Sequence, residues 1–550
     1  MTGRRRVGWT LALVALVAFA GALWARELIA NVAAIAAGIR GLLRGGPATA
    51  PGTPLHEGWE AAATIGLILL WIVLTLSISR RRFVRPLGLN GSFSVSSALL
   101  AVLGTAMFVV LLLATIVPVR LPALLLLGTA VSIGVVVIVL LRFPRKADTP
   151  DESSATVGTD QAPGLLRPLL LVLASVSLAL LVWVIARDIV YLAFYRPDAT
   201  GDEAYFWWRS IDQLFHLGYY DYMASFDVAG YPPGYPLMSN LLLGWVPGTL
   251  FSAAGRALPF VYGFSALWIL LRGTVTRRDL LSPTAAVYYI VGFVLLFGHE
   301  WIHSLFFQLW YGDAFATVIF ALILILLDHA RRETSGARDY GVLGLFGFGL
   351  GALAVLTKPP LSLLLLPAVL PTILIAQVLI DRTRGLVRPF LVAWAAMALG
   401  GFLTQYLWGA QMRMYGVGSV YTLDIGALLT FHPEGAFSQL VPYFFGGYRE
   451  VWVIFILTTA LALLHDWRRF LPFWLVSLGM VASVFFLYLG QWSAVEPESG
   501  ARYILHGAYG WILFSLGALA PPIKETICGW TSRFGIAEVR RRLGMGNAAP

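Results

Sequence analysis

Two adjacent carboxylates, Asp202 and Glu203, lie just past the end of a long apolar run, in a segment crowded with aromatic residues. A carboxylate at a water-accessible membrane boundary can accept a proton during group transfer or bind a metal ion. The segment continues to a second aromatic motif, GYPPGYP at 230–236, whose rings suit the headgroup level of a bilayer. Polar residues beside a span also form ordinary solvated loops, so this stretch by itself leaves both interpretations open.

Two basic residues, Lys358 and Arg502, each stand at the end of a predicted span. Cations in such places can hold a phosphate at headgroup depth, because a low-dielectric surround strengthens charge-assisted hydrogen bonds. Snorkelling toward water is the competing explanation for both side chains. Lys358 precedes two prolines, in a break between spans that leaves backbone groups free to line a cavity, which favours a binding role there.

A third pattern, HExxH, is formed by His299, Glu300 and His303. On a helix it places two imidazoles on one face, with a glutamate able to activate zinc-bound water, so a membrane-embedded zinc metalloprotease is a second function class. Against it, no HxxGxxH extension follows and the short pattern arises often by chance. The two histidines are otherwise expected beside Asp313, as acceptor- or metal-positioning residues, or as interfacial residues without a ligand.

The composition determines the class of elements that carry these residues. Of 550 residues, 58% are hydrophobic and 12% are charged, and the mean hydropathy is +0.77, which excludes an ordinary soluble globule. The net charge of +10 is spread through short loops instead of one basic domain, so we expect no nucleic-acid partner. The one cysteine, Cys528, excludes an intrachain disulfide and a cysteine-based metal cluster.

Apolar runs of about 17–24 residues are long enough to cross roughly 30 Å of hydrocarbon as helices. The sequence therefore predicts an all-α, polytopic integral membrane protein with about 14 transmembrane helices. The predicted spans are 7–24 (uncleaved), 58–78, 95–117, 121–141, 165–187, 257–272, 284–302, 313–328, 340–357, 360–380, 390–410, 448–465, 470–489 and 503–521.

The positive-inside rule orients these spans. If 237–254 lies along or dips into the membrane surface, as an interfacial part of the first core external loop, most Lys and Arg residues fall on one side. That side is predicted to be cytoplasmic. Asp202, Asp313, Lys358 and Arg502 then share the external face.

Four segments make up the predicted domain organisation. A four-span unit at 1–146 has no assigned role, and a polar, acidic, flexible linker, expected on the cytoplasmic side, follows at 147–163. The membrane core covers 164–521, and a basic cytoplasmic tail covers 522–550. A transporter is a further alternative, but no inverted halves with paired broken helices are evident.

The order of five motifs resembles the C-type glycosyltransferases, which use polyprenyl-phosphate sugars. It is most similar to the branch of Rgt-type and aminoarabinose lipopolysaccharide sugar transferases and protein O-mannosyltransferases. The resemblance covers about residues 165–521 and not the first four spans. Its motifs are Gly201-Asp202-Glu203-Ala204, Tyr231-Pro232-Pro233-Gly234-Tyr235-Pro236, Tyr311-Gly312-Asp313, Thr357-Lys358-Pro359 and Ala501-Arg502-Tyr503.

This resemblance implies a plasma-membrane enzyme of cell-envelope glycan synthesis, with its active site on the extracytoplasmic face. Asp202 or Glu203 would be the base that deprotonates an acceptor hydroxyl, while the sugar leaves its lipid phosphate with inversion. Asp313 would position the acceptor or a divalent cation, and the metal requirement is left open. Lys358 and Arg502 would bind the donor phosphate. The residues expected to shape the site are Tyr231, Pro232, Pro233 and Tyr503. The acceptor is a glycolipid, a polysaccharide or a protein.

Overall fold

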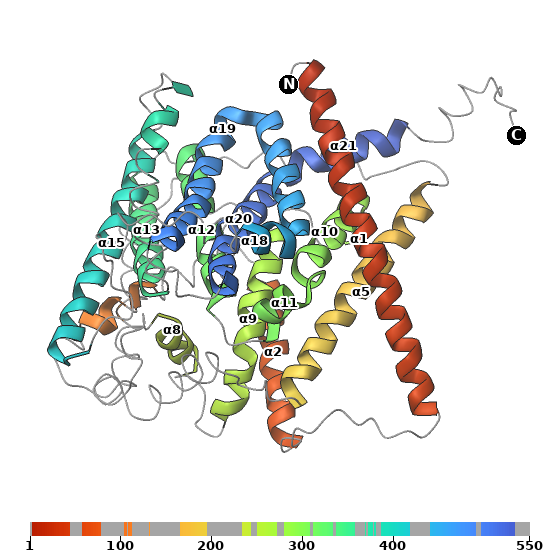
Figure 1. Cartoon of the computed structure of the whole chain (residues 1–550), viewed down its shortest axis with the longest axis horizontal. Helices are drawn as coiled ribbons and strands as arrows, with labels where there is room; N and C mark the ends of the chain where they lie inside the picture. The colour runs from red at the N-terminus through yellow and green to blue at the C-terminus, as the bar shows by residue number, and fades with distance from the viewer. Residues whose placement is uncertain are drawn as a thin grey trace, which may run out of the picture.

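The structure is a computed structural model, and it describes a helical bundle over the parts of the chain given next. The described residues are 3–43, 58–78, 104–106, 108–112, 131, 166–194, 234–243, 250–271, 280–308, 312–333, 337–357, 369, 372–377, 379–380, 387–417, 441–490 and 497–533. Across these ranges the regular elements are all helices and no strand occurs, so the prediction of an all-α protein is confirmed there. Figure 1 shows most of the helices side by side in one bundle.

Five of the described helices are long and apolar enough to cross a membrane. They are α1 (Gly3–Leu43), α5 (Leu166–Phe194), α9 (Phe251–Leu271), α15 (Val387–Met414) and α19 (Arg449–Gly490). Shorter apolar stretches lie in α2 (Gly58–Ile78), α10 (Pro283–Phe297) and α13 (Ala337–Thr357). The protein is therefore a membrane-embedded helical bundle. The predicted spans at 95–117, 121–141 and 360–380 fall mostly outside the described residues, and the full number of spans stays a prediction.

Helix α12 (Asp313–Glu333) is the central helix of the described bundle. All its described side chains from Asp313 to Asp328 are buried, and it packs against α9, α13, α15 and α20 (Pro497–Ala518). By contrast, α1, α5 and α15 expose apolar side chains such as Leu11, Leu169 and Phe402. In a bilayer the hydrocarbon chains of lipids would cover these outer faces. A carboxylate on α12 is thus enclosed by protein.

The start of α10 and the kink inside α19 both follow directly from local sequence. Ser282 caps α10 by accepting a hydrogen bond from the Ala285 amide at 3.1 Å, and Pro283 occupies the first turn, where its missing N–H costs nothing. Helix α19 contains the break expected between 448–465 and 470–489, because Asp466 leaves the helical region at φ −150° and ψ 84°. The carboxylate of Asp466 accepts a hydrogen bond from the Arg469 amide at 3.2 Å. Two arms of α19 therefore meet at this kink (Figure 1).

Close packing of α13 against α15 depends on glycine. A Cβ at Gly347 would lie 2.6 Å from the carbonyl oxygen of Ala393, and one at Gly351 or Gly400 would collide with the carbonyl of Met397 or Phe348. Small residues four apart allow such backbone contact between membrane helices. The successive contacts run in the same direction along both helices, so α13 and α15 are parallel.

The N-terminal helices pack directly onto the rest of the bundle. Helix α1 lies along α19 and α10, while α2 lies against α9 and α5. The α2–α9 contact contains an ion pair of 2.8 Å between Glu60 and the buried Arg256. A guanidinium nitrogen of Arg256 also approaches the carbonyl oxygen of Ala193, at 3.5 Å, near the end of α5. The starts of α2 and α9 and the end of α5 therefore lie at the same end of the bundle.

Candidate functional site

That end of the bundle gathers the helix ends on which the sequence predicted a site. It contains the end of α5, the end of α10, the start of α12, the residues just before α19 and the part of α20 around His506, as the side-chain contacts below establish. A short helix, α11 (Glu300–His303), and a π-helix, η5 (Ser304–Gln308), connect α10 toward α12. We call this region the polar end of the bundle.

An aspartate–histidine pair lies at the start of α12. The Asp313 carboxylate is 2.8 Å from Nε2 of His506 on α20, and the two residues are 3% and 2% exposed. With the carboxylate ionised, Nε2 of the imidazole is the donor, because an ionised carboxylate only accepts hydrogen bonds. Asp313 also occupies the first turn of its helix, where the helix dipole stabilises a negative charge. The pair can hold a carboxylate ionised and oriented inside the protein.

The second aromatic motif reaches the same place. Helix α8 (Gly234–Leu243) begins inside that motif, and the ring centroid of Tyr235 lies 6.1 Å from that of Phe315, two residues beyond Asp313. Tyr235 also lies 5.5 Å from the ring of Tyr262 on α9. With ten residues, or about 15 Å of helix, α8 is too short to cross a membrane. The last residues of 237–254 belong to α9, which starts at Phe251, and the prediction that this stretch lies along the membrane surface stays a prediction.

The end of α13 completes this arrangement. A Cβ at Gly234 would lie 2.6 Å from the backbone carbonyl of Leu356, so the start of α8 touches the last turn of α13. Thr357 is buried and donates its hydroxyl proton to the carbonyl of Leu353 at 2.7 Å. The next residue in the chain is Lys358. The structure therefore brings Gly234 and Thr357, from two of the motifs, into one neighbourhood.

The backbone of helix α20 includes two of the predicted site residues. Arg502 and Tyr503 lie within α20, and Arg502 precedes His506 by one helical turn. The remaining predicted site residues lie outside the described part of the chain. They are Asp202, Glu203, Tyr231, Pro232, Pro233 and Lys358.

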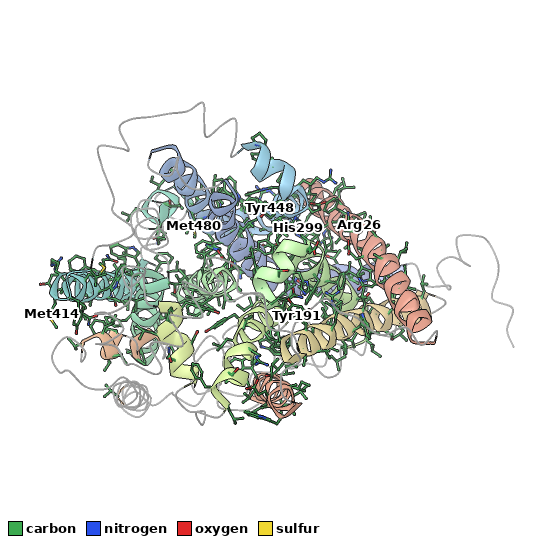
Figure 2. The ribbon with its side chains drawn as sticks, turned by 60° about the horizontal axis from the view of Figure 1, so that its bottom comes forward. Arg26, Tyr191, His299, Met414, Tyr448 and Met480 are labelled. Atoms are coloured by element: carbon green, nitrogen blue, oxygen red, sulfur yellow. The ribbon has the colours of Figure 1, made fainter. Side chains whose placement is uncertain are left out.

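The two imidazoles of the HExxH pattern bind to different segments. His299 lies in a bend before α11, and its Nε2 is 3.1 Å from the carbonyl oxygen of Gly447 in α18 (Val441–Gly447). Its ring lies 5.2 Å from that of Tyr448, and Figure 2 labels both residues. His303 instead pairs with Asp188 of α5, with 2.8 Å between Nε2 and the carboxylate. Among the residues that the structure describes, no group of three or more His, Cys, Asp or Glu side chains could hold a metal ion.

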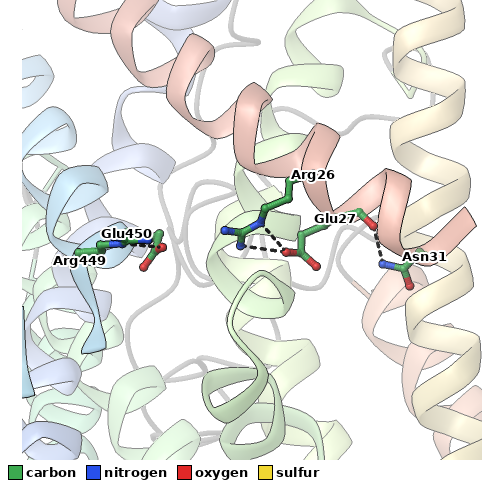
Figure 3. Close-up of polar contacts among 5 residues, drawn as sticks. All are labelled: Arg26, Glu27, Asn31, Arg449 and Glu450. Carbon is green, nitrogen blue, oxygen red and sulfur yellow. Dashed lines mark hydrogen bonds and ion pairs between the residues drawn. The ribbon is translucent and has the colours of Figure 1, made fainter. Parts of the chain in front are cut away.

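Exposed ion pairs lie on α1 and at the start of α19. The Arg26 guanidinium pairs with Glu27 at 2.9 Å on α1, and Arg449 pairs with Glu450 at 3.2 Å on α19 (Figure 3). Both arginines are largely exposed, and pairs between exposed neighbours contribute about 0–1 kcal/mol to stability. We therefore assign these four side chains to the surface of the bundle and not to the enclosed site.

Sequence reasoning did not identify His506, Asp188 or Gln308. Asp188 could have been recognised, because an ionisable residue within an apolar run is costly unless it has a partner. The predicted span at 165–187 ended one residue before Asp188, whereas α5 continues to Phe194. His506 carries no local signal, since its partner is 193 residues away in sequence.

Comparison of the chain with protein-family models, curated proteins and solved structures finds no match.

Proposed function

We propose that the protein is a membrane glycosyltransferase that moves a sugar from a polyprenyl-phosphate carrier to an acceptor hydroxyl. One observation carries the proposal: the enclosed Asp313–His506 pair lies where the second aromatic motif and the last turn of α13 meet. These parts belong to separate motifs of the resemblance described above. Their meeting at one end of the bundle is what a shared site requires.

The reaction needs one base and one cationic site. The acceptor oxygen attacks the anomeric carbon, its proton passes to Asp202 or Glu203, and the bond from that carbon to the phosphate oxygen breaks. The electron pair of that bond leaves with the polyprenyl phosphate, whose growing negative charge needs cations such as Lys358 and Arg502. Inversion at the anomeric carbon follows from a single displacement. The plasma membrane and its extracytoplasmic face are the proposed location.

Asp313 and His506 serve acceptor positioning in this proposal. An ionised carboxylate held by an imidazole can accept a hydrogen bond from a sugar or acceptor hydroxyl. Whether a divalent cation takes part is left to experiment, because Asp313 could also be one of its ligands. The acceptor can be a glycolipid, a polysaccharide or a protein.

The direct test is a transfer assay with purified protein in nanodiscs. Synthetic polyprenyl-phosphate sugars are offered as donors, with and without EDTA, and release of polyprenyl phosphate is measured. We expect release with at least one donor and its loss in Asp313→Asn. Wild-type protein that releases polyprenyl phosphate from no donor, across a panel of acceptors, would contradict the proposal.

A metal assay discriminates the zinc-protease alternative. In the structure His299 and His303 both direct Nε2 at oxygen acceptors on different helices, so binding zinc through these atoms would break both hydrogen bonds. We therefore expect no stoichiometric zinc in protein purified without chelator. Tightly bound zinc that disappears in a His299→Ala, His303→Ala double variant would favour the protease.

A further inference from the structure

A second buried cluster at the polar end is absent from the proposed chemistry. Asp188 of α5 is 0% exposed and lies in a candidate membrane span. It accepts hydrogen bonds from Nε2 of His303 at 2.8 Å and from the side-chain amide of Gln308 at 3.2 Å. Ser304 donates to the carbonyl oxygen of that amide at 3.2 Å, which directs its NH₂ group at the carboxylate. The guanidinium of Arg187 lies 3.9 Å from the carboxylate oxygen that accepts from Gln308.

The cluster joins two segments that lead to predicted acidic residues. Asp188 lies near the end of α5, and the chain that follows reaches Asp202 after 14 residues. His303 ends α11 and Gln308 ends η5, five residues before Asp313. A connection at this point fixes the end of α5 relative to the chain that enters α12.

The π-helix between His303 and Gln308 is enclosed by protein. The Phe307 ring stacks on Phe297 with centroids 4.7 Å apart, and Phe306 lies 5.5 Å from Tyr509 on α20. Single π-helical turns are rare in proteins overall, and those that occur are often found at functional sites. The Asp188 hydrogen bonds reach both ends of this turn, so they can set its register as well as its position.

We propose that Asp188, His303 and Gln308 are positioning residues that form a clamp between α5 and η5. The clamp fixes the separation between the end of α5 and the π-helix that precedes α12. The inference rests on the proposed glycosyltransferase function for its effect on turnover, but the clamp itself is a property of the fold. A buried carboxylate is costly without partners, and here the same partners hold two parts of the site in place.

Two substitutions of His303 separate positioning from chemistry. His303→Gln keeps a side-chain N–H that can reach Asp188, whereas His303→Leu removes the donor and keeps comparable bulk. A clamp predicts that the Gln variant retains most turnover. The Leu variant should lose about a hundredfold in kcat, the scale of a small misplacement of reacting groups, with little change in the KM for donor.

A matched control lies at the opposite end of α12. Asp328 there forms a two-point ion pair with Arg469, at 3.0 and 2.8 Å, about 22 Å along the helix from Asp313. Asp328→Asn should lower thermal stability and leave kcat unchanged. If it reduced kcat as much as His303→Leu does, the loss would reflect general destabilisation, and the clamp would be rejected. Gln308→Met removes one bond only and serves if His303→Leu does not fold.

A distance measurement tests the clamp without reference to catalysis. Spin labels at Val190→Cys and Glu300→Cys, both exposed, report the separation of α5 and α11 in a Cys528→Ser background. Double electron–electron resonance should give a narrow distribution that broadens in His303→Leu and stays narrow in His303→Gln. An unchanged distribution in His303→Leu overturns the clamp, even in protein that proves not to be a glycosyltransferase.

The kinetic outcomes are equally decisive. Full turnover in His303→Leu overturns the clamp. Equal loss in the folded Gln and Leu variants would mean that the imidazole itself reacts or binds metal, and would also overturn it. A wild-type protein inactive with every donor rejects the proposed function and leaves the resonance measurement to decide the clamp.

Discussion

Gly263 of α9 provides a direct test of how tightly the π-helix is held. A Cβ at this position would collide with the carbonyl oxygen of Phe306 and lie 2.8 Å from two ring carbons of Phe307. Real Cβ atoms almost never come that close to other heavy atoms. The first contact is to backbone, which cannot rotate away as the end of a long side chain can. Gly263→Ala must therefore move η5 or α9.

The expected magnitude comes from two opposing effects. Alanine is favoured over glycine inside a helix by about 0.8–1 kcal/mol. Overpacking a filled interior costs about 1–3 kcal/mol and occasionally more, and a backbone collision belongs at the upper end of that range. The net expectation is a loss of about 2 kcal/mol in stability. Turnover should fall as well, because the displaced π-helix leads directly to Asp313.

The assay compares Gly263→Ala with Gly344→Ala in α13. A Cβ at Gly344 meets nothing within 4 Å, so that variant should be as stable as wild type or slightly more stable. Thermal unfolding in nanodiscs, followed by tryptophan fluorescence, gives the midpoints, and polyprenyl phosphate release gives turnover. The reasoning is refuted if the two alanine variants unfold at the same temperature. It is also refuted if Gly263→Ala turns over normally despite a lower midpoint.

Three further predictions address the remaining parts of the site and fold. Asp202→Asn and Glu203→Gln each remove one candidate base. The variant that stays folded and loses about 10²- to 10⁴-fold in turnover identifies the residue that acts as the base, and normal turnover in both variants would exclude this role for both residues. Arg502→Lys should weaken donor binding about ten- to a hundredfold, since lysine cannot replace the two-point contact of a guanidinium, whereas a snorkelling anchor would show normal binding of polyprenyl phosphate. Arg256→Met removes the buried cation that pairs with Glu60 of α2 and should cost about 3 kcal/mol of stability, while Arg449→Gln, in an exposed pair, should change stability by less than about 1 kcal/mol.

The sequence predicted helix positions well where composition changes sharply. The bounds expected for 58–78 agree with α2, and the break near 465–470 coincides with the kink at Asp466. In both cases polar residues interrupt an apolar run, and a chain in hydrocarbon exposes polar groups only at its ends. The first span was underestimated, because α1 continues to Leu43 through residues that are less apolar. Helix formation continues beyond the membrane where nothing in the sequence stops it.

The site was predictable only in part, and the reason is physical. Asp313 begins a helix at a visible transition from polar to apolar residues, so its position at a helix end followed from the sequence. Its partner did not, because the contact with His506 is made through the packing of α12 against α20. Pairing between distant helices leaves no periodic signal in either helix. The same holds for the hydrogen bond between Asp188 and Gln308.

The chemistry of the buried carboxylates differs between the two ends of the bundle. At the polar end, Asp188 and Asp313 each face an imidazole, while Asp328 at the other end faces the guanidinium of Arg469. Arginine keeps its proton under all ordinary conditions, so the pair at Asp328 has one charge state and suits a permanent structural contact. An imidazole offers one N–H to each carboxylate at the polar end, whereas the guanidinium of Arg469 contacts both oxygens of Asp328. A carboxylate with a one-point partner can accept a further hydrogen bond, as Asp188 does from Gln308, which is the reason to look for substrate contacts at the polar end and for a permanent structural contact at the other.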